Sequence, residues 1–224
     1  MRVQEFQLAG AVLTARPSGA LWWAARRLLC VADLHLGKSE RFARRNGCLL
    51  PPYETRETLD RLAAEIDRLD PAAVVCLGDS FDDDAAAEGL SGDDLARLLG
   101  LIAGRRWIWV SGNHDPAPLT RAGEIAGDFV AGGITFRHEA RQGASAEVSG
   151  HWHPKIGVTL RGRRVTRPCF LVDEDRAILP AFGAYTGGLS ARHPALRPLM
   201  GPHARAILTG RVALSLPLDA ALAE

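Results

Sequence analysis

Three short apolar runs, each ending at a cluster of polar side chains, constrain the fold of this chain more than any other feature. The runs cover residues 28–32, 73–77 and 107–110, and their branched and aromatic residues are typical of strands buried on both faces. Amphipathic patterns over residues 54–69 and 93–103 predict helices between the runs. This alternation indicates right-handed crossovers and a largely parallel sheet.

The flanking sequence predicts further strands around this centre. Short apolar segments at 3–8, 11–15 and 20–24 indicate an antiparallel entry to the sheet. Residues 38–52 read as a flap or a short helix. Strand-like pieces broken by Gly and Pro predict a second, more antiparallel sheet, and these pieces cover residues 134–137, 158–160, 164–172, 178–179 and 206–216. With no linker or repeat, we expect one domain over residues 1–224, an α/β (α+β) two-sheet β-sandwich flanked by helices.

Composition and charge limit the classes of partner. Lys plus Arg number 27 against 26 Asp plus Glu, so attraction to nucleic acid would require local basic patches. No apolar stretch has transmembrane length and no leader is visible, so we expect no membrane partner and a cytoplasmic location. The four cysteines form no Cys-x-x-Cys pair, and we expect them to be reduced, with Cys30 and Cys76 in the core.

The polar residues that follow the strands have the character of metal ligands. Open α/β sheets bind ligands beyond the carboxyl ends of their strands, where these groups would lie. The candidates are Asp33, His35, Asp79, Asn113, His114, His138, His151 and His153. Carboxylate, amide and imidazole groups without thiolates suit Mn²⁺, Fe²⁺ or Zn²⁺. The set exceeds the needs of one ion, which indicates two ions about 3.5–4 Å apart.

Two of these assignments have simpler alternatives when each is taken alone. Asn113, His114 and Asp115 could merely form a turn after the third apolar run. His138 is identified only as a histidine at a strand end, and it could be a surface residue within Arg-His-Glu.

Four motifs in order resemble the calcineurin-like metallophosphoesterase superfamily. They are Asp33-Leu-His35, Gly78-Asp79, Gly112-Asn113-His114-Asp115 and Gly150-His151-Trp-His153. A closer resemblance, to the ligase-associated DNA damage response endonucleases of the PdeM type, covers most of the chain. It is carried by Asp33-Leu-His-Leu-Gly-Lys38, by the segment ending at Pro154, by Arg167-Pro-Cys-Phe170 and by residues 179–188.

The resemblance implies the metallo-dependent phosphatase fold and a dinuclear centre. One ion would be held by Asp33, His35, Asp79 and His153, and the other by Asp79, Asn113, His138 and His151, with Asp79 bridging. We expect Mn²⁺, with Fe²⁺ and Zn²⁺ as alternatives. The implied activity is phosphodiester hydrolysis of DNA by an endonuclease of DNA repair, through attack of a metal-bridging hydroxide. An ATP-dependent DNA ligase, a helicase and an exonuclease would be functional partners.

Catalytic roles follow from the same motifs. His114 would face the substrate and stabilise charge or protonate the leaving oxygen, with a turn histidine as the alternative. Asp115 and Asp82 would orient His114 and a metal-binding histidine respectively, although a solvated loop carboxylate is an alternative for either.

Substrate contacts depend on weaker signals. Lys38 is a candidate for a phosphate contact, and Arg41, Arg44 and Arg45 could contact flanking phosphates or form a solvated helical face. The glycines of residues 181–189 would permit either close approach to the cleft or a tight turn between the sheets. Alternative functions are a phosphomonoesterase or cyclic-nucleotide phosphodiesterase on small substrates, and a non-catalytic scaffold.

Overall fold

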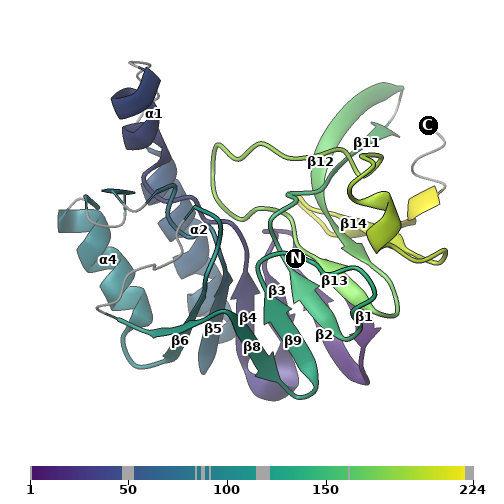
Figure 1. Ribbon diagram of the computed structural model, residues 1–224, viewed down its shortest axis with the longest axis horizontal. Coiled ribbons are helices and arrows are strands. Elements are labelled where there is room, and N and C mark those ends of the chain that lie inside the picture. The colour runs from purple at the N-terminus through teal and green to yellow at the C-terminus, as the bar shows by residue number, and fades with distance from the viewer. Residues whose placement is uncertain are drawn as a thin grey trace.

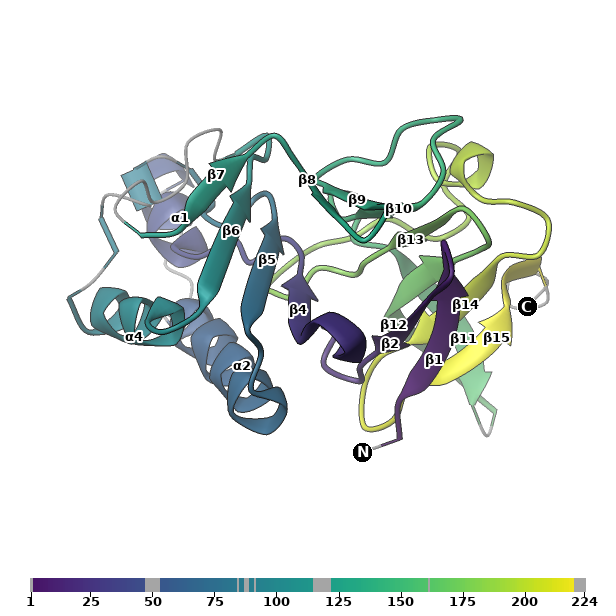
Figure 2. The same cartoon turned by 90° about the horizontal axis from the view of Figure 1, so that it is seen from below.

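Two β-sheets packed face to face, with helices against one of them, form the molecule (Figures 1 and 2). The structure is a computed structural model that describes residues 2–46, 53–83, 85–86, 89–90, 92–114, 122–160 and 162–219. The predicted two-sheet sandwich flanked by helices is confirmed. Within these ranges, no helix combines the length and apolar character needed to cross a bilayer.

The first sheet follows chain order from one edge to the other. Its strands are β1 (Gln4–Leu8), β2 (Ala11–Ala15), β3 (Leu21–Trp23), β4 (Leu28–Val31), β5 (Ala73–Leu77), β6 (Arg106–Val110) and β7 (Glu124–Ala126). Pairing is antiparallel from β1 to β4 and parallel from β4 to β7, so the predicted antiparallel entry and parallel centre are both confirmed.

The helices are α1 (Lys38–Asn46), α2 (Glu54–Leu69) and α4 (Gly92–Ile102), with 3-10 turns η1 (Ala24–Arg26) and η2 (Arg197–Leu199).

The second sheet contains most of the later strands. They are β8 (Asp128–Ala131), β9 (Ile134–Arg137), β10 (Glu147–Ser149), β12 (Arg163–Val172), β13 (Arg176–Ile178), β14 (Arg205–Leu208) and β15 (Leu214–Pro217). The spatial order is β15-β14-β12-β13-β10-β9-β8, and β11 (Lys155–Leu160) pairs with β12. Most pairs are antiparallel, as predicted, but β10 is parallel to both β9 and β13. The carboxyl ends of β9 and β10 therefore lie at one edge.

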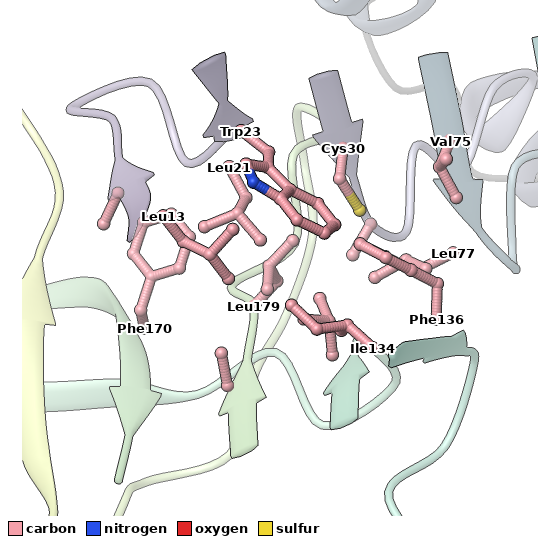
Figure 3. Close-up of a cluster of buried hydrophobic side chains, with 14 of the residues drawn as sticks. Leu13, Leu21, Trp23, Cys30, Val75, Leu77, Ile134, Phe136, Phe170 and Leu179 are labelled. Carbon is pink, nitrogen blue, oxygen red and sulfur yellow. The ribbon is translucent and has the colours of Figure 1, made fainter. Parts of the chain in front are cut away.

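Apolar side chains fill the space between the sheets and the space beneath the helices. Leu13, Cys30, Phe136 and Phe170 meet between the two sheets (Figure 3). Strand β6 serves both layers, because Ile108 and Val110 face the second sheet whereas its two tryptophans face α2 and α4. Full burial of an apolar side chain such as valine, isoleucine or phenylalanine stabilises the fold by roughly 1.5–3 kcal/mol. These layers hold the strand ends in place.

The cysteines behave as expected where the structure describes them. Cys30 and Cys76 are fully buried, and so is Cys169, and none of the three forms a disulfide with a residue that the structure describes. Burial raises the pKa of the Cys30 and Cys169 thiols, which keeps them protonated and unreactive. Cys48 lies outside the described residues.

Candidate metal centre

The loops that follow β4 and β5 are joined by main-chain hydrogen bonds. His35 N–H donates to the Asp79 carbonyl at 2.9 Å, and Asp82 N–H donates to the Leu36 carbonyl at 3.0 Å. Parallel pairing thus continues past the ends of both strands, through a bridge between Leu36 and Phe81. This continuation brings Asp33, His35 and Asp79 to one edge of the first sheet.

The first group of candidate ligands consists of Asp33, His35 and His153, whose donor atoms lie within 4.8 Å of one another. Nε2 of His153 is 3.2 Å from Oδ1 of Asp33, and the rings of His35 and His153 are 5.3 Å apart. Asp33 and His35 are buried. The group draws on both sheets, since His153 follows β10.

The second group consists of Asp79, His138 and His151, again within 4.8 Å. Nε2 of His138 is 3.0 Å from Nδ1 of His151 and 3.5 Å from Oδ2 of Asp79. Asn113, which is exposed, places its Nδ2 at 3.2 Å from the same nitrogen of His151. His138 is only 6% exposed, so it is not the surface histidine of the alternative interpretation.

The chemistry of this donor set fits divalent cations. Burial and the neighbouring His138 lower the pKa of His151, which favours the neutral imidazole that binds metals. Within the described part of the chain, Nε2 of His35 and Nε2 of His153 are buried without a hydrogen-bond partner. Because a buried polar atom without a partner is costly, a metal ion bound at these nitrogens would remove that cost. The residues present fit two adjacent ions.

The imidazoles are oriented by partners behind them. Nδ1 of His138 lies 2.8 Å from the Leu77 carbonyl, which directs Nε2 of that ring toward the centre. Nδ1 of His35 lies 2.9 Å from Oδ1 of Asp82, so Asp82 occupies the orienting position expected for it. Such partners fix the tautomer and the ring orientation of metal-binding histidines.

Several of the candidate ligands have left-handed backbone conformations. The φ angles are positive at Asp33 (53°), His35 (47°), Asp79 (45°), His151 (68°) and His153 (44°). Residues with a Cβ adopt this region only when the surrounding structure compensates for a cost of about 1–3 kcal/mol each. The concentration of strained residues at one edge marks a functional site.

Two glycines allow the chain to pack closely around this edge. Gly78 has φ +73°, and a Cβ there would lie 2.4 Å from Nδ1 of His138. At Gly183 a Cβ would lie 2.1 Å from the Leu34 carbonyl oxygen. Gly183 N–H also donates to the Asp33 carbonyl at 3.1 Å, so close approach to the metal-side loop is the reason for glycine in the 181–189 segment.

His114 lies beside the centre. Its N–H donates to Oδ1 of Asp79 at 2.9 Å, and its Nδ1 is 3.1 Å from the main-chain carbonyl of Asp82. If Nδ1 carries the proton and donates to that carbonyl, Nε2 is left for a substrate. The main-chain partner of His114 carries no sequence signal and was missed by sequence reasoning. Asp115, predicted to orient His114, lies outside the described residues.

The basic residues of α1 have a different environment from the one expected. Nη1 of Arg41 is 2.8 Å from Oδ2 of Asp82, and Nζ of Lys38 is 3.7 Å from Oδ1. Burial alone would raise the pKa of Asp82, but contacts with His35, Arg41 and Lys38 hold it well below its usual range. Arg41 therefore supports the centre through Asp82. The side chains of Arg44 and Arg45 lie outside the described residues.

Replacement of Asp82 by Asn tests this support. Asp82→Asn keeps the size of the side chain but removes the charge that holds His35, Lys38 and Arg41. We expect metal affinity to fall about 10–100-fold, the typical effect of losing a partner of a metal-binding histidine. Titration with Mn²⁺ by isothermal calorimetry measures this change, and unchanged affinity would show that Asp82 does not orient His35.

Comparison with known proteins agrees with this geometry. Residues 26–158 match the family model of the calcineurin-like phosphoesterases, and this range contains every candidate ligand. The chain is similar to the crystal structure of Pseudomonas putida nuclease MPE, with a TM-score of 0.74 and 28% identity over 96% of this chain and 100% of that chain. A comparison with curated proteins finds no match. The fold is that of the metallophosphoesterases, and the protein is a metal-dependent phosphoesterase. Because the family model matches more than half of its length, the chain belongs to the calcineurin-like phosphoesterase family.

Proposed function

We propose that this protein is a dinuclear-metal phosphodiesterase that hydrolyses DNA phosphodiester bonds as an endonuclease, in DNA repair. The observation that carries the dinuclear centre, on which the proposal depends, is the contact between the two ligand groups. The main-chain N–H of His151, in the second group, donates to both carboxylate oxygens of Asp33, in the first, at 3.0 and 3.2 Å. Similarity over the full length of a nuclease supports the choice of substrate.

The chemistry requires positive charge and a nucleophile at neutral pH. Two bound divalent ions would neutralise the non-bridging oxygens of a phosphodiester and lower the pKa of a coordinated water from 15.7 to about 7. Asp33, His35 and His153 would hold one ion, with His138, His151 and Asn113 holding the other. Asp79, in the second group, would contact both ions.

His114 would supply the proton. With Nδ1–H donating to the Asp82 carbonyl and the main chain held by the Asp79 carboxylate, the imidazolium form of His114 would give its Nε2 proton to the leaving oxygen and become neutral. A phosphodiester needs this donor because its leaving alkoxide is a poor leaving group. Asp115, the next residue in the sequence, is proposed to orient His114.

The metal and the cellular setting are further parts of the proposal. Mixed oxygen and nitrogen donors support Mn²⁺, with Fe²⁺ and Zn²⁺ as alternatives. The resemblance to ligase-associated endonucleases supports functional partnership with an ATP-dependent DNA ligase, a helicase and an exonuclease, and the expected cytoplasmic location stays part of the proposal.

A comparison of substrates tests the proposal. We expect the protein loaded with Mn²⁺ to nick circular single-stranded DNA in preference to hydrolysing a cyclic nucleotide or a phosphomonoester. Chelation by EDTA should abolish the nicking, because the residues themselves offer no substitute for the ions. Hydrolysis of the small esters without any nicking would contradict a DNA substrate and favour a small-molecule phosphoesterase.

A further inference from the structure

The β11–β12 hairpin carries a concentration of positive charge that the metal centre does not use. Between residues 148 and 172 the sequence contains five Lys and Arg residues and no Asp or Glu, although the whole chain has a net charge of only +1. These residues are Lys155, Arg161, Arg163, Arg164 and Arg167. We propose that this hairpin is an arm that binds the phosphates of the DNA strand on one side of the scissile bond, an inference that rests on the proposed function.

The register of the hairpin separates an anchored face from an open one. Ile156 and Val158 are buried in an apolar cluster on one face. On the opposite face the pairs are Lys155 with Pro168, Gly157 with Thr166 and Thr159 with Arg164. Most residues of the open face are small or polar. The apolar contacts of the other face hold the arm to the body, and they leave the open face uncovered.

Arg164 is laid along the open face. A Cβ at Gly157 would lie 3.4 Å from Nε and 3.7 Å from Nη2 of Arg164, so the absence of a side chain there leaves room for the guanidinium. The five N–H donors of a guanidinium suit the oxygens of a phosphate. Since the face offers no large aromatic or apolar surface on which bases could stack, it can bind the phosphates of a DNA backbone without contacting the bases.

The arginines of β12 offer charge on both faces of the hairpin, since Arg164 lies on the open face whereas Arg163 and Arg167 pair with Leu160 and Ile156 on the other. Arg163, Arg164 and Arg167 are exposed, and none of them forms an ion pair with any residue that the structure describes. By contrast, Arg41, Arg106 and Arg137 each contact a carboxylate. Three like charges within five residues repel one another, and an anionic partner relieves that repulsion.

The base of the arm adjoins the metal centre. His153 lies two residues before β11, and Nζ of Lys155 donates to the Thr186 carbonyl at 3.2 Å. Thr186 belongs to the segment whose Gly183 contacts the Asp33 loop. In Figure 1 the hairpin and α1 rise from the same side of the molecule, with the loop after β13 between them. Arg164, opposite Thr159, lies roughly 13 Å along the strand from Lys155, a reach of a few nucleotides.

Salt dependence of DNA cleavage tests the arm. We compare the wild-type enzyme loaded with Mn²⁺ with the triple variant Arg163→Gln, Arg164→Gln and Arg167→Gln. The plot of log kcat/KM for single-stranded DNA against log salt should become shallower by about 0.7 for each phosphate contact that is lost, and so by up to about 2. Hydrolysis of bis(p-nitrophenyl) phosphate, which is too small to reach the arm, should not change.

Two matched variants separate charge from structure. Replacing the same three arginines by lysine should preserve most of the slope, because lysine keeps the charge. The triple variant Arg68→Gln, Arg105→Gln and Arg106→Gln removes equal charge from the end of α2 and the start of β6, at the far end of the first sheet. That control should leave the slope close to the wild-type value.

The outcomes distinguish the arm from the proposed function. Nicking with the same salt slope in the arm variant and the far-end control would overturn the arm while leaving the DNA endonuclease intact. An equal loss of bis(p-nitrophenyl) phosphate hydrolysis would also overturn it, because the arginines would then be structural. A wild-type enzyme that hydrolyses the small diester but never cuts DNA would overturn both proposals.

Discussion

Replacement of Asp79 by Asn should remove nearly all phosphodiester hydrolysis while the fold stays intact. The introduced amide would still accept the N–H of His114, a bond that Oδ1 of Asp79 makes at 2.9 Å, but it lacks the negative charge that Asp79 brings to the centre. Loss of that charge affects both proposed ions at once. Since each ion contributes several kcal/mol and 1.36 kcal/mol is tenfold in rate, kcat should fall on the order of 10³-fold or more.

Rates with bis(p-nitrophenyl) phosphate and Mn²⁺, together with metal content after gel filtration, measure the effect of Asp79→Asn. The control is Asp83→Asn in the same loop, where Oδ1 accepts from Ala86 N–H at 2.8 Å and Oδ2 lies 3.9 Å from Nε of Arg41. Asp83→Asn should retain activity and metal. An Asp79→Asn enzyme with full metal content and wild-type turnover would refute the bridging role.

Replacement of His114 by Ala should lower kcat without lowering metal content. General acid catalysis typically contributes about 10²–10⁴-fold, and His114 contacts the ligand Asp79 only through its main chain, which the substitution preserves. The ring of His114 packs against that of His35 at 5.4 Å and belongs to neither ligand group, so its removal takes no donor atom from the centre. Turnover should therefore fall while the Mn²⁺ concentration for half-maximal activity stays the same.

The neighbouring substitution Asn113→Ala provides the matched comparison. Asn113 contacts His151 in the second group, so its loss should raise the Mn²⁺ concentration needed for activity. Saturating Mn²⁺ should then restore most of the turnover, which it cannot do for His114→Ala. The role assignments are wrong if His114→Ala loses metal and Asn113→Ala does not.

Strands with strong local signals were predicted, and strands built on distant partners were not. The apolar runs that became β4, β5 and β6 are visible because every residue in them is selected for burial. Strand β10 contains only Glu147, Val148 and Ser149, and its glutamate is fully buried. Arg137 and Arg176, from β9 and β13, neutralise that carboxylate. From the sequence alone, a glutamate predicts an exposed loop position, because burial of its charge is stabilised only by partners that are distant in the sequence.

The candidate ligands were predictable as types but not as conformations. Histidines and carboxylates at strand ends predict a metal site, because these donors suit divalent ions. Positive φ at Asp33, Asp79 and His151 could not be predicted from the sequence, since Asp and His adopt this region only occasionally and glycine is the residue that normally indicates it. Strain of this kind is tolerated only because packing from both sheets holds these residues.

The sequence by itself determined the parallel centre of the first sheet and the chemical character of its edge, because burial periodicity and donor type are local properties of the chain. The tertiary structure decided which donors meet and how they are oriented. It paired β9 with β10, so that His138 and His151 approach to 3.0 Å. It also directed Arg41 to Asp82, at 2.8 Å. Those choices depend on contacts between residues far apart in the chain, where no local pattern carries the information.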